Sequence, residues 1–236
     1  MTFERDGFAL VPGFVAEHEL ADLRTAVDEA LARPLPPGCE RPHNTLAPLR
    51  WNDPIVRALL TPPRAAAVSD STAGDDVRFI SAYISVKDPH SAALSWHRDW
   101  WGWDHPVSYR REASQVAVLC YLSDTTEANS ALRVVAGSHL RSTSPYHART
   151  LEARAGDAVV IDYRLLHGTH ANGSDIRRDA LILNFAPSWA SLPEDVRAHL
   201  IRHPALPSDG DDPLLPQYEG TPRDLPLNRI APGHFG

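Results

Sequence analysis

The sequence predicts a mainly β fold, an antiparallel sandwich or barrel with N-terminal helices packed on one outside face. Beyond Asp76, six short runs are rich in β-branched and aromatic residues, and turn residues rather than helices separate them. Helical spacing of apolar residues is confined to the first part of the chain and one short stretch near its end. The six predicted strands are residues 77–87, 94–100, 115–123, 131–137, 158–167 and 179–187.

The N-terminal part begins with a short predicted strand over residues 8–11, which Pro12 and Gly13 close. Apolar residues then recur on one face from position 20 to position 31, which predicts an amphipathic helix of about four turns. The segment 33–48 is dense in proline and predicts an irregular loop over the surface.

Two short helices are predicted between residues 54 and 67, because Pro62 and Pro63 interrupt the apolar pattern there. The polar segment 69–76 predicts a turn before the first long strand. Beyond Ser191 only residues 193–201 have helical spacing, and the rest is rich in Pro, Gly and Asp. We expect a single domain over residues 1–236, with a helical part (about 1–75), a β core (about 76–190) and an extended C-terminal arm (about 191–236).

The composition excludes several classes of function. Lys and Arg number 23 against 30 Asp and Glu, which gives a net charge of −7, so a nucleic-acid partner is not expected. No apolar run of about 18 residues is present to span a membrane, and the N-terminal residues are acidic where a secretory signal is basic. Cys39 and Cys120 make neither a disulfide framework nor a CxxC motif, so we expect a cytoplasmic protein.

The most informative stretch is ALSWHRDWWGWDHP, residues 93–106. On a strand, residues i and i+2 project to the same face, so His97 and Asp99 can point together into a barrel. An imidazole beside a carboxylate supplies two of the three ligands of the facial triad that holds non-haem Fe(II). The alternative is a hydrogen-bonded His–Asp pair on a polar surface.

A second group of polar residues lies downstream. His167 ends a predicted buried strand, where it can reach a metal held by a neighbouring strand, and His170 is the alternative ligand. Arg178 begins the last strand, and its planar guanidinium can bind a carboxylate with two parallel hydrogen bonds. By strand alternation, Arg178 shares one face with Ala180, Ile182 and Asn184.

Together these blocks resemble the phytanoyl-CoA dioxygenase (PhyH)-like family of Fe(II)/2-oxoglutarate-dependent oxygenases. The resemblance extends over most of the chain, and its specificity comes from the order of the blocks. It implies a double-stranded β-helix, or cupin-like jelly roll. The matching blocks are FERDGFALVPGFVAEHELADLR, WHRD, YLSDTTEANSALRVVAGSH and LLHGTHANGSDIRRDALILNFAP.

The resemblance also implies roles for individual residues. Iron is expected on His97, Asp99 and His167, and the distal carboxylate of 2-oxoglutarate on Arg178. The glycine after LLH and the interval to the arginine favour His167 over His170. An aspartate ligand favours hydroxylation, because halogenating relatives carry a small residue at that position.

Other positions have two interpretations each. Thr169 matches a hydroxyl that lies against 2-oxoglutarate in relatives, or it satisfies local backbone groups. Tyr83 matches a pocket-lining position where it could contact 2-oxoglutarate, or it is a core aromatic. Trp100, Trp101 and Trp103 crowd the metal segment, where one or two of them are expected to line the substrate cavity and the others to fill the barrel wall.

The expected activity is a dioxygenase that uses Fe(II), 2-oxoglutarate and O2 to hydroxylate an unactivated C–H bond of a small organic metabolite, releasing succinate and CO2. The arginine-rich composition and the tryptophan cluster suit an enzyme of secondary metabolism. Two alternatives are a metal-dependent isomerase, epimerase or lyase on the same fold and a non-catalytic binding paralogue. The sequence leaves the oligomeric state open.

Overall fold

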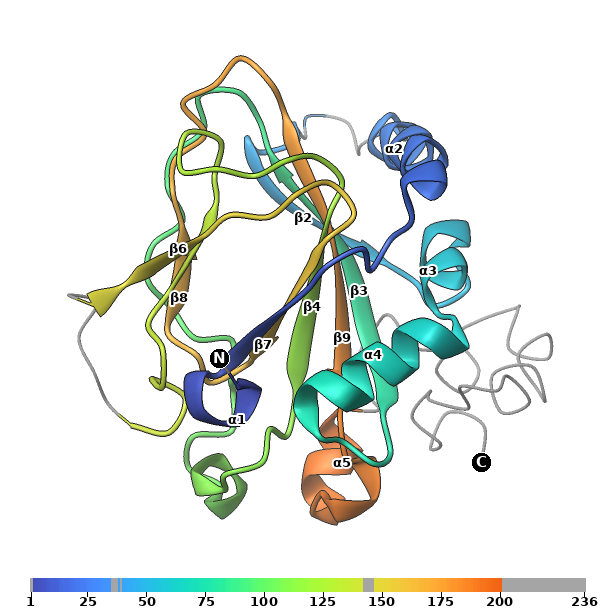
Figure 1. The fold of residues 1–236 in the computed structure, drawn as a ribbon. Coiled ribbons are helices and arrows are strands. Elements are labelled where there is room, and N and C mark those ends of the chain that lie inside the picture. The colour runs from blue at the N-terminus through green and yellow to red at the C-terminus, as the bar shows by residue number, and fades with distance from the viewer. Residues whose placement is uncertain (1, 35–37, 39, 142–146, 201–236) are drawn as a thin grey trace.

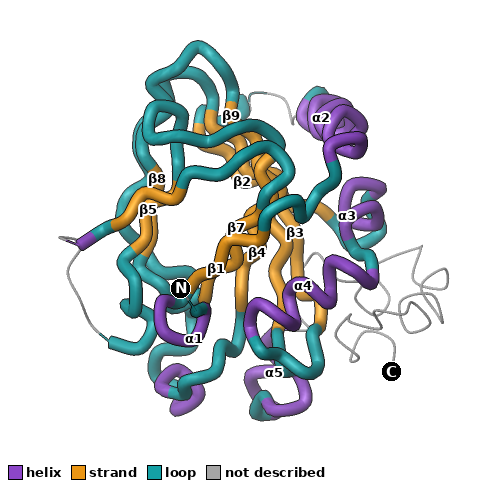
Figure 2. Tube along the Cα trace, in the orientation of Figure 1, coloured by secondary structure: helices purple, strands orange, loops and turns teal. Residues whose placement is uncertain are grey.

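The computed structural model describes residues 2–34, 38, 40–141 and 147–200. They form two antiparallel sheets that face each other, with helices outside the larger sheet (Figures 1 and 2). The larger sheet has the strand order β1-β7-β4-β9-β3-β2 and the smaller one the order β6-β5-β8. The strands are β1 (Phe8–Val11), β2 (Asn44–Leu49), β3 (Arg78–Lys87), β4 (Val116–Tyr121), β5 (Leu132–Val134), β6 (Arg149–Leu151), β7 (Ala158–Asp162), β8 (His167–Thr169) and β9 (Arg178–Ala186). The prediction of a mainly β, antiparallel fold is confirmed.

Strand β4 lies inside the larger sheet and is buried on both faces. Its residues alternate between two apolar cores, because successive side chains of a strand point to opposite faces. The outer core, shared with the helices, takes Val116, Val118 and Cys120, and the inner core, between the sheets, takes Ala117, Leu119 and Tyr121. Burial on both faces explains why this strand is almost continuously apolar.

The predicted helices cover the outer face of the larger sheet (Figure 1). In the longest, the amphipathic pattern places Leu20, Leu23 and Val27 in the core. The helices are α1 (Phe3–Asp6), α2 (Glu17–Leu31), α3 (Pro54–Leu59), α4 (Pro62–Thr72) and α5 (Glu194–Leu200), and the short 3-10 turns are Pro106–Tyr109 and Trp189–Ser191.

The break between α3 and α4 lies where the prolines predicted it. The Asp53 side chain accepts a hydrogen bond from the Ile55 amide at the start of α3, and the two prolines begin α4. Helix α4 nevertheless continues through Thr72, into the segment predicted as a polar turn. The Ser71 and Thr72 hydroxyls bond to carbonyls four residues earlier, so these polar side chains are satisfied within the helix.

The prediction that all of segment 33–48 is irregular is wrong, because Asn44–Leu49 forms β2. This strand lies at the edge of the larger sheet and pairs only with β3. An edge strand tolerates Pro48, which has no amide hydrogen to donate.

The predicted strand over residues 94–100 is also absent. This segment makes only an isolated antiparallel bridge between His97 and His167. The short strand β6, which pairs with β5, was not predicted. Both differences concern the smaller sheet, whose pairing depends on contacts between segments distant in the chain.

Strand register orders the inner face of the larger sheet into rows of side chains. At one end Lys87 pairs with Arg178. The following rows are Ser85, Ala180 and Tyr121; then Tyr83, Ile182, Leu119 and Val159; then Ser81, Asn184, Ala117 and Ile161. The amide of Tyr163 donates to the carbonyl of Gln115 beyond the last of these rows.

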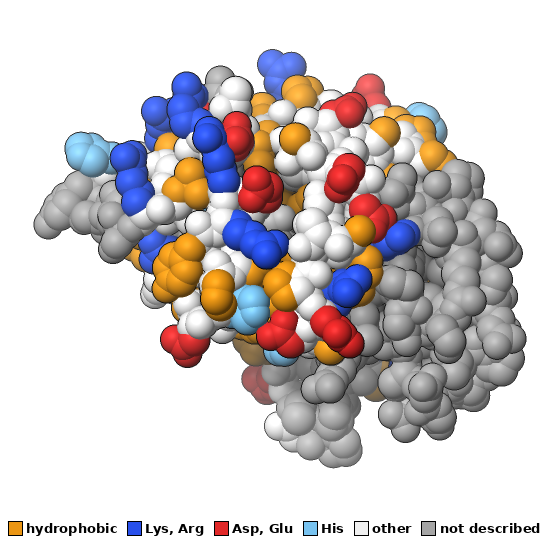
Figure 3. All heavy atoms as spheres, turned by 90° about the horizontal axis from the view of Figure 1, so that it is seen from below, with side chains coloured by type: hydrophobic (Ala, Val, Ile, Leu, Met, Phe, Trp, Pro, Cys, Tyr) orange, Lys and Arg blue, Asp and Glu red, His pale blue; other side chains and the backbone are white. Residues whose placement is uncertain are grey.

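Two expectations concern the surface and the tail. Within the described residues, no helix is long and apolar enough to cross a membrane. On the described part of the face in Figure 3, acidic and basic side chains are interspersed with apolar ones.

The predicted helix near the C-terminus is present as α5, whereas residues 201–236 of the predicted arm, like Cys39, lie outside the described residues. Cys120 is buried, and burial raises the pKa of its thiol to about 12.

Candidate metal centre

The structure brings His97, Asp99 and His167 together. One ligand atom from each of the three lies within 4.8 Å of the others. Each carboxylate oxygen of Asp99 lies 3.6 Å from the Nε2 atom of one histidine. The arrangement presents two imidazoles and one carboxylate to a common point, which is the ligand set of a facial triad.

Hydrogen bonds fix which nitrogen of each imidazole is available. Nδ1 of His97 lies 2.7 Å from the Ser95 carbonyl oxygen, and Nδ1 of His167 lies 2.9 Å from the Leu165 carbonyl oxygen. Because a carbonyl only accepts, Nδ1 carries the hydrogen in both rings, and each neutral ring presents the lone pair of Nε2 toward Asp99. Burial lowers the pKa of His167, which keeps this ring in the neutral form that binds metals.

Backbone hydrogen bonds, rather than a regular strand, aim His97 and Asp99. The His97 and His167 main chains exchange two hydrogen bonds of 2.9 and 3.0 Å, and the Asp99 amide donates to the Tyr163 carbonyl at 3.0 Å. These bonds tie the segment to the start of β8 and to the end of β7. The two side chains therefore meet as strand alternation predicts, although the local structure differs.

A cavity of about 590 Å³ opens from the triad into the space between the sheets. Asp99 and His167 form part of its wall. The apolar wall consists of Leu46, Ile80, Trp101, Ala117, Leu119, Ile161, Ile182 and Leu200, and the other polar lining residues are Tyr83, Gln115, Tyr163, Asn184 and His199. Burial, with the nearby charge of Asp99, holds the pKa of Tyr163 well above its ordinary value, so its hydroxyl stays protonated.

Arg178 lies beyond this cavity on the inner face and is 3% exposed. It donates one hydrogen bond of 2.9 Å to the Ser130 carbonyl, and its guanidinium carbon lies 5.7 Å from the centre of the Tyr121 ring. Within the described part of the chain, no group accepts a hydrogen bond from its Nε. A buried arginine with an unused donor fits a carboxylate ligand.

Lys87 pairs with Arg178 in the register of β3 and β9, so the two side chains lie on the same face. Lys87 is 4% exposed, and burial together with the charge of Arg178 lowers its pKa to about 8. Among the described residues, no carboxylate forms an ion pair with either side chain. Two buried cations therefore lie side by side at this end of the inner face.

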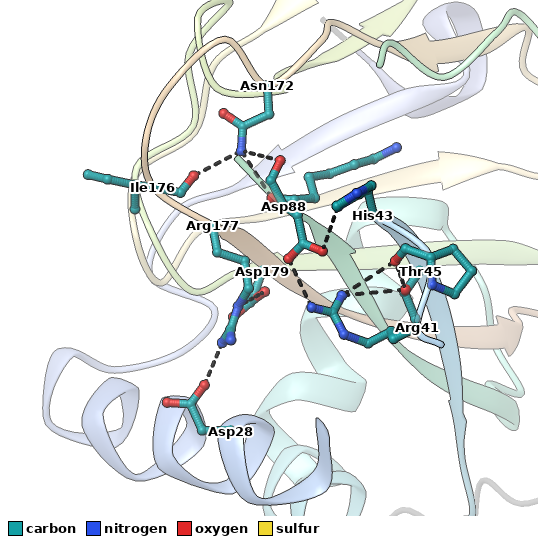
Figure 4. Close-up of polar contacts among 11 residues, drawn as sticks. Asp28, Arg41, His43, Thr45, Asp88, Asn172, Ile176, Arg177 and Asp179 are labelled. Atoms are coloured by element: carbon teal, nitrogen blue, oxygen red, sulfur yellow. Dashed lines mark hydrogen bonds and ion pairs between the residues drawn. The ribbon is translucent and has the colours of Figure 1, made fainter. Parts of the chain in front are cut away.

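Polar contacts around the end of β3 and the start of β9 hold the backbone near the two cations in place (Figure 4). The Asn172 side-chain amide donates to the carbonyls of Lys87, Asp88 and Ile176 at 2.8–3.1 Å, which ties the β8–β9 connection to the end of β3. Arg177 binds Asp179 and also reaches Asp28 of α2. These bonds fix the backbone on both sides of the two cations.

The remaining predicted site residues have different outcomes. Tyr83 and Trp101 line the cavity, and Trp101 stacks on His199 with ring centres 3.7 Å apart. The Thr169 hydroxyl accepts a hydrogen bond from the Leu94 amide, so it satisfies local backbone, and its contact with 2-oxoglutarate stays a prediction. His170 contacts Thr150 rather than the triad.

Two of the three tryptophans do not line this cavity. Trp100 is 3% exposed and donates from Nε1 to the Ser108 hydroxyl, so it is a core residue. Trp103 lies under the guanidinium of Arg98 and lines a second cavity, which His97 of the triad also lines. Trp101 therefore lines this cavity and Trp100 fills the core, while contact of any of the three rings with a substrate stays a prediction.

Sequence reasoning missed several residues of the cavity. Strand alternation placed Asn184 on the face of Arg178, but Asn184 was not assigned to the site. Gln115 and Tyr163 lie at the ends of strands β4 and β7, where alternation also places them inward. His199 carries no signal in the sequence, because its position depends on how α5 packs against Trp101.

Comparison with known proteins places the chain in a family. The model of the phytanoyl-CoA dioxygenase (PhyH) family matches residues 3–180. Dioxygenase FUM3 of Gibberella moniliformis (strain M3125 / FGSC 7600) is 32% identical over 107 residues, which cover 44% of this chain but only 33% of FUM3. L-proline trans-4-hydroxylase of Streptomyces griseoviridis is 22% identical in an alignment that covers 91% of this chain and 93% of that protein.

Solved structures agree on the fold. The epimerase SnoN, in complex with Fe3+, alpha ketoglutarate and nogalamycin RO, matches 90% of each chain with a TM-score of 0.63 and 21% identity. This likeness confirms the predicted jelly roll. Because the family model covers well over half of the sequence, this chain belongs to the phytanoyl-CoA dioxygenase family of iron- and 2-oxoglutarate-dependent dioxygenases.

Proposed function

We propose that this protein holds Fe(II) on His97, Asp99 and His167, binds 2-oxoglutarate through Arg178, and hydroxylates a C–H bond of a small organic metabolite. In the overall reaction one oxygen atom of O2 enters the substrate as a hydroxyl group. The other enters succinate, as 2-oxoglutarate loses CO2. The proposal rests on one observation: the triad and two buried cations both lie at the space between the sheets, and no carboxylate of the described residues pairs with either cation.

The triad supplies two neutral imidazoles and one carboxylate, and all three are already oriented toward a common point. Both Nε2 lone pairs point toward the carboxylate of Asp99, and carbonyl oxygens hold the rings from behind. Such a set leaves adjacent coordination positions free for the oxoacid and O2. The iron and the oxoacid supply the oxidation of the C–H bond when both are bound.

Arg178 and Lys87 would orient the oxoacid. Arg178 keeps its Nε free for a carboxylate oxygen, while its bond to Ser130 and the ring of Tyr121 hold the guanidinium. Lys87 adds a second positive charge to the same end. The distal carboxylate would lie at these cations, so the other end of the oxoacid points along the inner face toward the triad.

The cavity walls would exclude water from the reacting carbon. Apolar side chains, among them Ala117 and Leu119 of β4, Ile161 of β7 and Ile182 of β9, form most of the cavity wall. Exclusion of water and fixed orientation are what a protein contributes when the cofactor carries the oxidation. We also propose that the enzyme acts in secondary metabolism.

An anaerobic titration of metal-free protein with Fe(II) and then 2-oxoglutarate tests the binding step. A chelated oxoacid on Fe(II) gives a weak visible charge-transfer band, and we expect that band in the wild type. Arg178→Leu should weaken the binding of 2-oxoglutarate on the order of 2–5 kcal/mol, because one partner of a buried charged pair is lost. Arg149→Leu, an exposed arginine on β6, is the matched control and should keep the wild-type affinity.

The outcomes separate the alternatives. Iron binding without the band favours an isomerase or lyase that uses the metal as a Lewis acid, and absence of iron binding contradicts the triad assignment. If the band forms, reaction under 18O2 distinguishes hydroxylation from epimerisation. A hydroxylase places one labelled atom in the product, whereas an epimerase returns a product without the label.

A further inference from the structure

The end of the cavity away from Arg178 carries a polar cluster that the proposed function does not use. It consists of Gln115, Tyr163, Ser81 and Asn184, from four neighbouring strands or strand ends. The Asn184 amide bonds the Ser81 hydroxyl at 2.7 Å, and Gln115 makes a side-chain hydrogen bond with Tyr163. We refer to these four residues as the amide cluster.

Two oxygen atoms of the amide cluster have no hydrogen-bond partner among the residues that the structure describes. They are Oε1 of Gln115 and Oδ1 of Asn184. The side chains are deeply buried, with only 4% and 1% of their surfaces exposed, and both line the cavity. A buried acceptor without a protein partner is unfavourable, and it is retained where a ligand completes its hydrogen bonding.

The amide cluster lies too far from Arg178 to serve the same ligand. Asn184 follows Arg178 by six positions on β9, which corresponds to about 20 Å along a strand. The five-carbon chain of 2-oxoglutarate is much shorter than this distance. A ligand that meets these two acceptors is therefore a different molecule, one that occupies the cavity beside the triad.

The charge of the cavity wall restricts the chemistry of that molecule. Among its described lining residues there is no Arg, Lys or Glu, and the sole carboxylate belongs to Asp99 of the triad. Neither an anion nor a cation would find an opposite charge there, apart from the metal centre. The rest of the wall is apolar or aromatic, including the stacked rings of Trp101 and His199.

We propose that Gln115 and Asn184 are specificity-determining residues that select a neutral substrate with an apolar skeleton and hydroxyl groups. The hydroxyls donate to Gln115 Oε1 and Asn184 Oδ1, while the skeleton contacts the aliphatic wall. This inference rests on the proposed function, because it places the substrate next to the iron triad. A site built to accept hydrogen bonds rejects analogues that cannot donate them, since its buried oxygens are then left unpaired.

Three six-membered ring compounds test the inference: cyclohexane-1,4-diol, cyclohexanecarboxylate and cyclohexylammonium. Their binding to the metal-free and the Fe(II)- and 2-oxoglutarate-loaded protein is measured by saturation-transfer NMR. We expect the diol to bind most tightly to the wild type in both states. Gln115→Leu and Asn184→Leu should each weaken the diol at least fivefold, as expected when a hydrogen bond to a buried partner is lost.

Two further variants distinguish a loss of ligand binding from a loss of the folded structure. Asn184→Asp retains acceptor oxygens and adds a negative charge, so it should bind cyclohexylammonium more tightly than the wild type does. Asn52→Leu makes the same amide-to-leucine change outside the cavity and should leave all three affinities unchanged. Thermal unfolding of each variant shows whether the fold is retained.

The results distinguish this inference from the proposed function. If the charge-transfer band forms but the leucine variants bind the diol as the wild type does, this inference is wrong and the proposed function stands. The same holds if a charged ring compound binds the wild type better than the diol, or if the diol does not bind. If the amides control diol binding and the band is absent, the cavity assignment stands and the proposed cosubstrate fails.

Discussion

Lys87 offers the sharpest test of the anion site, because it is the only lysine in the chain. A buried ammonium beside Arg178, without a carboxylate partner, destabilises the folded protein when no anion is bound. Its pKa falls from 10.5 to about 8. At 1.36 kcal/mol per pKa unit, this shift corresponds to a penalty of about 3 kcal/mol when the group is charged in both states.

The sign of the pH dependence follows from this shift. Below pH 8 Lys87 is protonated in the folded and unfolded protein, and the full penalty applies. Between about pH 8 and 10.5 the folded protein loses the proton first, so the unfolded state binds more protons and stability rises with pH. Lys87→Met removes the charge, so its gain over the wild type should be largest at neutral pH and should shrink through this window.

Lys87→Met, which should stabilise the free protein, should weaken the binding of 2-oxoglutarate. The ligand's distal carboxylate favours the protonated ammonium, so Lys87→Met should bind 2-oxoglutarate more weakly by about 1.5–3 kcal/mol, the range for hydrogen bonds to charged groups. For the wild type, affinity should fall as the pH rises through about 8, because binding then requires proton uptake. The variant should lack this step.

A single lysine allows a direct measurement. Protein labelled with 13C at the lysine Cε atom gives one side-chain resonance, and its pH titration reports the pKa of Lys87. We expect a midpoint near 8 in the metal-free protein and a higher midpoint with Fe(II) and 2-oxoglutarate bound. Urea unfolding of wild type and Lys87→Met at several pH values measures the stability difference. A midpoint at the ordinary value, or a methionine variant that is less stable at pH 7, would refute the reasoning.

Three further predictions follow from the site. His97→Ala and Asp99→Ala should abolish Fe(II) binding and oxidation while the circular dichroism spectrum stays as in the wild type; turnover in both variants would reject the iron assignment. Asn172→Ala should lower the free energy of unfolding by about 2 kcal/mol and weaken 2-oxoglutarate, because the β8–β9 connection is released from β3; unchanged affinity would show that Arg178 is positioned without it. Trp100→Phe should destabilise the fold by about 1–3 kcal/mol, because the Ser108 hydroxyl loses its buried donor, yet leave the charge-transfer band in place; loss of the band in a folded variant would contradict its assignment to the core.

Sequence periodicity predicted the inner strands of the larger sheet better than its edge strand β2. Strands β3, β4, β7 and β9 lie in long apolar runs because both of their faces are buried. The edge strand β2 was missed, because an exposed edge accommodates prolines that exclude an inner strand. Local propensity cannot indicate which of these situations applies until the position of the strand in the sheet is known.

The convergence of the three candidate metal ligands could be predicted, whereas the direction of each tryptophan ring could not. His97 and Asp99 are separated by one residue, and in this segment their main-chain amides are held by β8 and β7. The direction of each ring after Asp99 depends on the backbone of an irregular loop, which no periodicity describes. As a result Trp101 reaches the cavity, while Trp100 and Trp103 do not.

Strand β9 links the two recognition tasks of the proposed enzyme. Arg178 lies at its start and Asn184 near its end, on the same face, so one strand carries both the cation for the cosubstrate and the acceptor for the substrate. A shift of register by one residue would turn both to the outer face, since side chains alternate with a period of two. The register irregularity between Phe79 and Ser81 of β3 sets Ser81 opposite Asn184, where the two side chains bond. Bulges of this kind re-aim side chains next to active sites, so substrate choice can change at this end of the sheet without disturbing the pairing of Lys87 with Arg178.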